Sequence, residues 1–120
     1  MSKKLLVIDD NEAILDAIVI TLESEGYQVF TATSGGQIYE HIQTFVPDLI
    51  LLDYRLPGDN GGVIAKNLKT NSHTRHIPII MMSANYNVRD VIQGCGADEF
   101  FPKPFDIEEL LSTVRRFLLD

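Results

Sequence analysis

Five polar residues of this sequence come at or just after the end of a short apolar run: Asp9, Asp10, Asp53, Ser83 and Lys103. Three carboxylates brought to one place would repel one another and raise one another's pKa unless a cation were present. An all-oxygen cluster suits a hard divalent ion. Mg2+ fits best because it needs only one or two protein carboxylates and keeps water ligands that a phosphate can replace. A lysine there would add a directed positive charge for phosphate oxygens. These residue types therefore predict a site for Mg2+ and phosphate, provided that the fold brings them together.

The apolar runs alternate with segments of helical periodicity along the whole chain. Strands are predicted at 5–8, 27–32, 49–52, 77–82 and about 100–101, and helices after residues 11, 34 and 106 and at about 63–69 and 88–95. Asn11 and Asp106 are expected to act as N-caps of the first and last helices. The segment 56–62 is dense in turn formers and is predicted to be a loop.

This alternation predicts an α/β fold, namely a doubly wound five-stranded parallel sheet with five helices on its two faces. The chain of 120 residues is expected to form a single domain, 1–120, because two separate cores would each be too small. In doubly wound sheets, ligands bind outside the carboxyl ends of the strands. That edge is where the five polar residues are expected to meet.

Composition excludes several classes of protein. Seventeen acidic against ten basic side chains give a formal charge of −7, which argues against a surface for nucleic acid or for anionic membranes. Cys95 is the only cysteine, so a disulfide framework is excluded. No apolar run approaches the roughly 18–20 residues that span a bilayer, and the first residues do not resemble a signal peptide. We therefore expect a soluble, cytoplasmic protein.

Four motifs, in this order and spacing, resemble the receiver domain of two-component response regulators. They are Val7–Asn11 (VIDDN), Leu51–Gly61 (LLDYRLPGDNG), Met82–Ala84 (MSA) and Gly96–Phe105 (GADEFFPKPF). The resemblance covers essentially the whole chain. It implies the flavodoxin-like, CheY-like strand order 2-1-3-4-5.

The resemblance also implies roles for the polar residues. Asp53 would be the phosphoacceptor, whose carboxylate attacks phosphorus and becomes an aspartyl phosphate. Asp10, Asp53 and the backbone carbonyl of Arg55 would bind Mg2+, and Asp9 would act on the ion directly or through water. Carboxylates alone would repel the incoming phosphate, so the ion is expected to neutralise charge there.

Further roles fall on the last two motifs. Lys103 would neutralise charge on the phosphoryl group, and the Ser83 hydroxyl and the Ala84 backbone N–H would hold phosphoryl oxygens. The Lys103–Pro104 peptide bond is expected to be cis, as in relatives.

The resemblance implies a conformational output in a phosphorelay. Ser83 and Phe100 would be the switch residues, and Arg55 and Asn85 would tune the lifetime of the phosphoryl group. The switched surface would be the face of the fourth helix, fifth strand and fifth helix. The protein would assist its own phosphorylation and dephosphorylation as a signalling protein and would not be an enzyme.

Partners follow from the same resemblance. The phosphodonor would be a sensor histidine kinase or a histidine phosphotransfer protein, and the output would pass to a protein partner or to a fused output domain. A homodimer could form through the switched face, with no direct contact to nucleic acid or membrane. A stand-alone receiver and a receiver belonging to a longer protein both remain open.

Two other functions fit an Asp at a strand end. A Mg2+-dependent phosphatase of haloacid-dehalogenase type would need a second Asp two residues after the nucleophile, where Arg55 stands, and room for a cap domain. A flavin or nucleotide binder would need a phosphate loop rich in Gly or Thr after the first strand, where Asp9–Asp10–Asn11–Glu12 would repel a phosphate in the absence of metal. The receiver is the favoured interpretation.

Overall fold

A computed structural model of the chain describes residues 2–56, 58–84 and 94–119. Its elements are, in chain order, β1 (Lys4–Ile8), α1 (Glu12–Ser24), β2 (Gln28–Ala32), α2 (Gly35–Thr44), β3 (Leu49–Asp53), β4 (Arg55–Leu56), β5 (Asp59–Asn60), α3 (Gly61–Thr70), β6 (Ile79–Ser83), β7 (Glu99–Pro102) and α5 (Ile107–Leu118).

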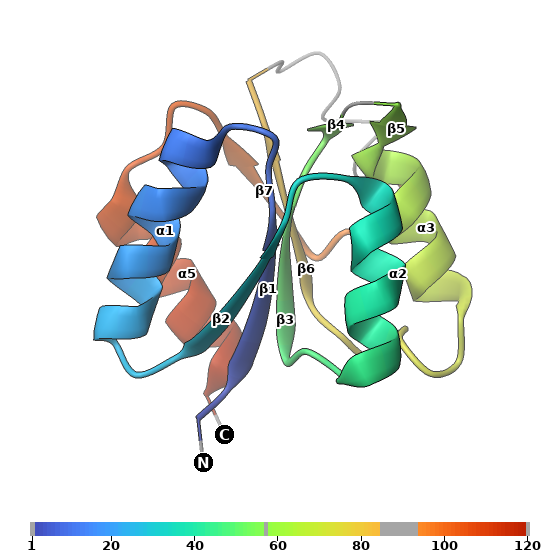
Figure 1. Ribbon diagram of the computed structural model, residues 1–120, viewed down its shortest axis with the longest axis horizontal. Coiled ribbons are helices and arrows are strands. Elements are labelled where there is room, and N and C mark those ends of the chain that lie inside the picture. The colour runs from blue at the N-terminus through green and yellow to red at the C-terminus, as the bar shows by residue number, and fades with distance from the viewer. Residues whose placement is uncertain (1, 57, 85–93, 120) are drawn as a thin grey trace.

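The main sheet has five parallel strands in the order β2-β1-β3-β6-β7. Because β4 and β5 form a separate two-stranded hairpin, β6 and β7 are the fourth and fifth strands of the main sheet, and the predicted order 2-1-3-4-5 is confirmed. The strands run in register, so Ile8 lies opposite Leu52, Asp53 opposite Met82, and Ser83 opposite Pro102. The carboxyl ends of the strands therefore meet along one edge, at the top of Figure 1.

Two helical layers cover the sheet, with α1 and α5 on one face and α2 and α3 on the other (Figure 1). Alternate residues of β1 supply the two cores. Leu5 and Val7 pack with the helices α1 and α5, whereas Leu6 and Ile8 pack with α2 and α3. Every residue of β3 is buried, as its continuous apolar sequence predicts for a strand covered on both faces.

The predicted caps of the first and last helices are confirmed. The Asn11 side chain accepts a hydrogen bond from the Ile14 N–H, at 3.2 Å, and Asp106 accepts one from the Glu108 N–H, at 2.8 Å. After α1, Gly26 adopts a φ of 91°, a left-handed conformation that favours glycine.

The segment after β3 differs from the sequence prediction. The predicted loop 56–62 includes parts of the β4–β5 hairpin, in which Arg55 pairs with Asn60 and Leu56 with Asp59. Helix α3 begins at Gly61, two residues before the predicted start, because the Asn60 side chain accepts hydrogen bonds from the N–H groups of Gly62 and Val63. The fourth strand of the main sheet begins at Ile79 instead of Ile77.

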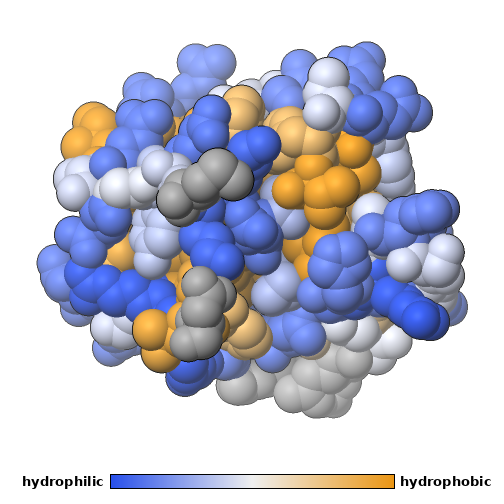
Figure 2. All heavy atoms as spheres, turned by 90° about the horizontal axis from the view of Figure 1, so that it is seen from below, coloured by the Kyte–Doolittle hydropathy of each residue, from blue (hydrophilic) through white to orange (hydrophobic). Residues whose placement is uncertain are grey.

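The predicted fourth helix, 88–95, falls largely outside the described residues, as does Asn85. The described part of the chain therefore contains the other four predicted helices. No helix in that part is long and apolar enough to cross a membrane. Seen from the edge opposite the strands' carboxyl ends, polar side chains cover much of the surface and apolar side chains form separate patches between them (Figure 2).

Candidate functional site

The three aspartates meet where β1 and β3 end. Asp9 and Asp10 directly follow β1, and Asp53 is the last residue of β3, which pairs with β1 in the sheet. One carboxylate oxygen from each of the three residues lies within 4.8 Å of the others. The parallel register of two neighbouring strands thus produces the acidic cluster that the sequence predicted.

The three carboxylates differ in burial. Asp9 is fully buried, Asp53 is 6% exposed and Asp10 is exposed. The Asp9 Oδ1 accepts a hydrogen bond of 2.9 Å from the Asn11 N–H, so one oxygen of the buried carboxylate is fixed by the turn into α1. The Asp53 Oδ1 lies 3.5 Å from the Arg55 backbone nitrogen.

Lys103 brings the only side-chain cation that the structure shows bonded to this cluster within the described residues. Its Nζ donates to Asp9 Oδ2 at 2.6 Å and to Asp53 Oδ2 at 3.3 Å. The Lys103 backbone N–H donates to the Ser83 carbonyl at 2.9 Å, which ties the segment after β7 to the end of β6. The peptide bond between Lys103 and Pro104 is cis, as predicted.

The electrostatics of the site follow from this arrangement. Burial and the neighbouring Asp9 charge raise the pKa of Asp53 to about 6, and the ammonium of Lys103 offsets only part of this effect. Burial alone would lower the pKa of Lys103, but its hydrogen bonds to Asp9 and Asp53 and their charges raise it above its usual value. Three carboxylates against one ammonium leave the cluster short of positive charge.

The donor set fits a hard divalent cation. All three side chains offer oxygen, and two of them are buried. Burial and the Asp9 charge, which raise the pKa of Asp53, both disfavour its ionised form, and a bound cation would stabilise that form. Mg2+ is therefore chemically compatible with these residues.

A pocket of about 320 Å³ opens over the cluster. It is lined by six of the predicted site residues: Asp10, Asp53, Arg55, Ser83, Ala84 and Lys103. Ser83 is 3% exposed. A phosphoryl group in this pocket would meet the Asp53 carboxylate, the Ser83 hydroxyl and the Lys103 ammonium together.

Three of the predicted functional positions are not among the described residues that line this pocket. Asp9 is buried beneath it and contacts Lys103 and the Asn11 N–H. Phe100, the predicted switch aromatic, is 8% exposed and packs in the core that lies on the α2 and α3 side of the sheet. Asn85 is not among the described residues.

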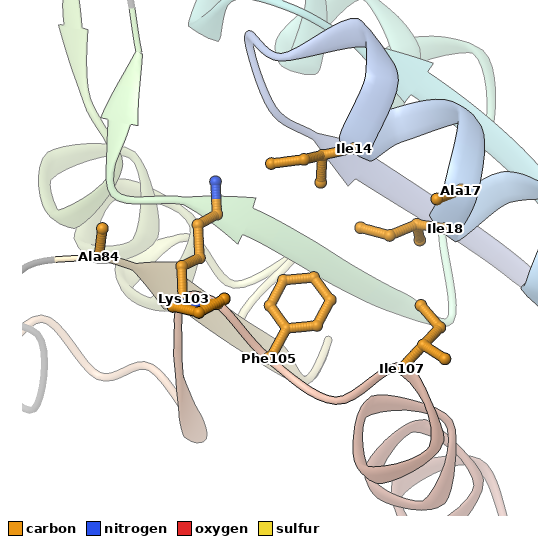
Figure 3. A pocket seen from close by; sticks show the side chains of 8 residues that line it. Ile14, Ala17, Ile18, Ala84, Lys103, Phe105 and Ile107 are labelled. Carbon is orange, nitrogen blue, oxygen red and sulfur yellow. The ribbon is translucent and has the colours of Figure 1, made fainter.

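An apolar groove that sequence reasoning missed adjoins the site. Its volume is about 460 Å³, and it shares Ala84 and Lys103 with the pocket over the aspartates. Figure 3 shows Ile14 and Ile18 of α1 facing Phe105 and Ile107 across the groove. Ile18 is buried in the core and Ile14 is only half-buried, and both line the groove.

Comparison with known proteins decides the family. A family model described as the response regulator receiver domain matches residues 5–115. The chain belongs to this family. As a receiver domain it carries the phosphoacceptor role of two-component signalling, and the matches do not support a phosphatase of haloacid-dehalogenase type.

Curated relatives include response regulators of several bacteria. The chain is 40% identical over 117 residues to the DNA-binding dual master transcriptional regulator RpaA of Synechocystis sp., covering 96% of the chain and 48% of that protein. It is 38% identical over 120 residues to the phosphate regulon transcriptional regulatory protein PhoB of Pseudomonas aeruginosa, covering 98% of the chain and 52% of that protein. The chain thus spans about half the length of these relatives.

Solved receiver structures superpose along nearly the whole chain. The chemotaxis response regulator CheY4 of Vibrio cholerae aligns with a TM-score of 0.91 at 29% identity, covering 98% of this chain and all of that one. The receiver domain of the sensor histidine kinase PA1611 of Pseudomonas aeruginosa, solved with a magnesium ion in its active site cleft, aligns with a TM-score of 0.88 at 28% identity, covering 98% of both chains. The CheY-like fold is confirmed.

Proposed function

We propose that this receiver accepts a phosphoryl group on Asp53, with Asp9, Asp10, Ser83 and Lys103 completing the site. The observation that carries the proposal is the cluster of three carboxylates at the ends of parallel strands, two of which line one pocket together with a lysine and a serine. These side chains come from four segments of the chain, those that follow or end β1, β3, β6 and β7. The site therefore depends on the whole fold and on no single motif.

The covalent step uses the Asp53 carboxylate as the nucleophile. A carboxylate oxygen forms a bond to phosphorus while the bond between phosphorus and the donor breaks, and the bonding electron pair leaves with the donor atom, an imidazole nitrogen of a phosphohistidine. The pKa of about 6 leaves Asp53 largely ionised at pH 7 and above, so the attack needs no separate general base.

Charge is the main barrier to this step, because two anions must meet. Lys103 is held next to Asp53 by its shorter hydrogen bond to Asp9, so its positive charge is in place before the phosphate arrives. Ser83 and Ala84 also line the pocket, and the Ser83 hydroxyl and the Ala84 N–H would donate to phosphoryl oxygens.

We assign the metal site to the Asp9–Asp10–Asp53 cluster, with the Arg55 backbone carbonyl as a further ligand. The clustered oxygens and the raised pKa of Asp53 support Mg2+ at this position. When bound, Mg2+ would neutralise negative charge on the carboxylates and on the transferring phosphoryl group. Asp9 is already paired with Lys103 and Asn11, which favours Asp10 and Asp53 as the direct ligands.

The phosphodonor is proposed to be a sensor histidine kinase or a histidine phosphotransfer protein in the cytoplasm. The apolar groove between α1 and the segment before α5 shares two residues with the phosphoacceptor pocket. A protein that places a phosphohistidine over Asp53 must therefore cover this groove as well. We assign the groove as the docking surface for that donor.

The proposed output is a change in packing that begins at Ser83. Ser83 pairs with Pro102 of β7, which lies two positions after the buried Phe100. A shift of Ser83 toward a phosphoryl group would therefore displace β7 and change the packing of the Phe100 side chain. The recipient is proposed to be an output domain or a protein partner, because the RpaA and PhoB relatives are described as transcriptional regulators and extend beyond the matched region.

Intact mass spectrometry after incubation with Mg2+ and acetyl phosphate tests the assignment of Asp53. The wild-type chain should gain the mass of one phosphoryl group, and Asp53→Asn should gain none while it keeps the far-UV circular dichroism of the wild type. Labelling of the Asp53→Asn variant at another residue would contradict the assignment. A folded wild type that binds neither Mg2+ nor the phosphoryl analogue beryllofluoride would contradict the function itself.

A further inference from the structure

The β4–β5 hairpin connects the phosphoacceptor strand to α3. Its first residue, Arg55, lies two positions after Asp53 and lines the phosphoacceptor pocket. Arg55 pairs with Asn60, and Leu56 pairs with Asp59. The position of Asp59 and Asn60 therefore fixes where the Arg55 backbone lies relative to Asp53.

The second strand of the hairpin is held from the α3 side by hydrogen bonds. The Gly61 N–H donates to the Tyr54 carbonyl at 2.7 Å, and the Asn60 side chain accepts from the first N–H groups of α3. These bonds close the segment upon itself. They do not fix it to any element that is distant in the sequence. The Tyr54 N–H donates to the Met82 carbonyl at 2.8 Å, which ties the start of the segment to β6.

The contact with α2 holds the second strand of the hairpin. The carboxylate of Asp59 packs so closely on Gly35, the first residue of α2, that a Cβ at Gly35 would overlap it. The same Cβ would lie 3.0 Å from Cδ1 of Ile64 in α3, so α2, α3 and the hairpin all meet at this glycine. A carboxylate at the positive end of a helix is also electrostatically favourable, and here the Ser34 side chain makes no capping bond of its own.

We propose that Gly35 and Asp59 are positioning residues for the phosphoacceptor site. Their close contact fixes the hairpin against α2 and thereby holds Arg55 at the pocket. The functional part of this inference rests on the proposed role of Arg55 in metal binding, whereas the structural part concerns the hairpin alone.

Gly36 offers a matched control for this contact. It lies next to Gly35 in the first turn of α2 and is exposed, and a Cβ there would meet nothing within 4 Å. Gly35→Ala and Gly36→Ala bring the same gain in helix propensity. Any difference between the two variants therefore reports on the contact with Asp59 and Ile64.

The experiment measures Mg2+ affinity by isothermal titration calorimetry and amide hydrogen exchange of Arg55 and Asn60 without metal. The variants are Gly35→Ala, Gly36→Ala, Asp59→Ala and the double variant Gly35→Ala/Asp59→Ala. Gly36→Ala should match the wild type. Gly35→Ala should bind Mg2+ about tenfold more weakly, as expected when a residue that supports a metal ligand is displaced, and its hairpin amides should exchange faster.

The double variant decides whether the two residues act through one contact. Asp59→Ala removes the carboxylate that a Cβ at Gly35 would strike, so the double variant should regain the Mg2+ affinity of Asp59→Ala alone. The inference would be overturned if the losses of Mg2+ affinity in Gly35→Ala and Asp59→Ala simply added in the double variant. It would also be overturned if Gly35→Ala matched Gly36→Ala in both Mg2+ affinity and amide exchange. If the wild type failed to bind Mg2+, the proposed role of Arg55 in metal binding would be wrong. The amide exchange rates would still show whether the contact between Gly35 and Asp59 holds the hairpin in place.

Discussion

Lys103 is bonded more closely to Asp9 than to the phosphoacceptor: its ammonium lies 2.6 Å from Asp9 Oδ2 and 3.3 Å from Asp53 Oδ2. Asp9 is fully buried, so this ion pair compensates a charge that water cannot reach. The pairing also keeps the lysine at the site before any phosphate is present. Beside its proposed part in the metal site, Asp9 thus holds the lysine that is proposed to meet the phosphoryl group.

Replacing Lys103 by alanine should separate metal binding from phosphoryl transfer. Asp9, Asp10 and Asp53 remain, so Lys103→Ala should still bind Mg2+, but the rate of labelling by acetyl phosphate should fall by about 100-fold or more because a preorganised cation is lost. Without divalent ions, the uncompensated Asp9 should also lower the free energy of unfolding by about 2–4 kcal/mol.

Quenched time courses of labelling by acetyl phosphate measure the rate, and urea titrations with and without Mg2+ measure the free energy of unfolding. Lys69→Ala is a useful control, because Lys69 also forms an ion pair, with Asp98, but among residues that do not line the phosphoacceptor pocket. A Lys103→Ala variant with wild-type labelling would show that the lysine has only a structural role.

The raised pKa of Asp53 predicts that the site costs stability at neutral pH. A folded-state pKa of about 6 against an ordinary value of 3.8 means that the folded chain holds this proton more tightly than the unfolded chain does. The free energy of unfolding of the wild type should therefore fall as the pH rises from about 4 through about 6. Asp53→Asn, which has no charge to bury, should be more stable than the wild type at pH 7.5 by up to about 3 kcal/mol.

Urea denaturation in EDTA between pH 4 and pH 8 measures this difference, which should vanish near the acid end. Asp16→Asn removes the same charge from an exposed position of α1 and provides the comparison. If Asp53→Asn proved less stable than the wild type at pH 7.5 without metal, the proposed cost of keeping a charged Asp53 buried next to Asp9 would be wrong.

A substitution in the groove should distinguish a protein donor from a small one. Ala17 is exposed on α1 and lines the groove, so Ala17→Arg would place a long charged side chain in the proposed docking surface. We expect phosphotransfer from a cognate histidine kinase or phosphotransfer protein to fall by at least about tenfold, a loss of roughly 1.4 kcal/mol in binding. Labelling by acetyl phosphate should not change.

Ile20→Arg is the matched control for this substitution. Ile20 is 69% exposed on the same helix and does not line the groove, so the same charge there should leave both reactions unchanged. Equal effects of the two substitutions on the protein donor would mean that docking does not involve the groove.

The strands and the acidic cluster could be predicted because their signals are local and the fold then aligns them. The runs LLVI and LILL are apolar without alternation, which is typical of strands covered on both faces. Once two such strands are parallel neighbours, the residues after them must meet at one edge. The cluster of Asp9, Asp10 and Asp53 follows from that geometry.

The parts that could not be predicted depend on contacts between distant segments. Turn formers in 56–62 indicate a change of chain direction, but not that Asn60 caps α3 or that Asp59 packs on Gly35. The groove was missed because a helical stripe such as Ile14 and Ile18 looks the same whether it is fully covered or borders a hollow. Whether the stripe is fully covered or borders a groove depends on where Phe105 and Ile107, which are distant in the sequence, lie relative to α1.

The strand order makes the Lys103–Asp9 ion pair a link across the sheet. Lys103 follows β7 at one edge of the sheet, whereas Asp9 follows β1, and β3 and β6 lie between them. Neighbouring strands are about 4.8 Å apart, so this ion pair links backbones separated by roughly 14 Å across the sheet. The Lys103 side chain thus links the two outer members of the four strands β1, β3, β6 and β7, at the edge where their backbone hydrogen bonds end. Peeling β7 away from that edge would require breaking a nearly dry ion pair first.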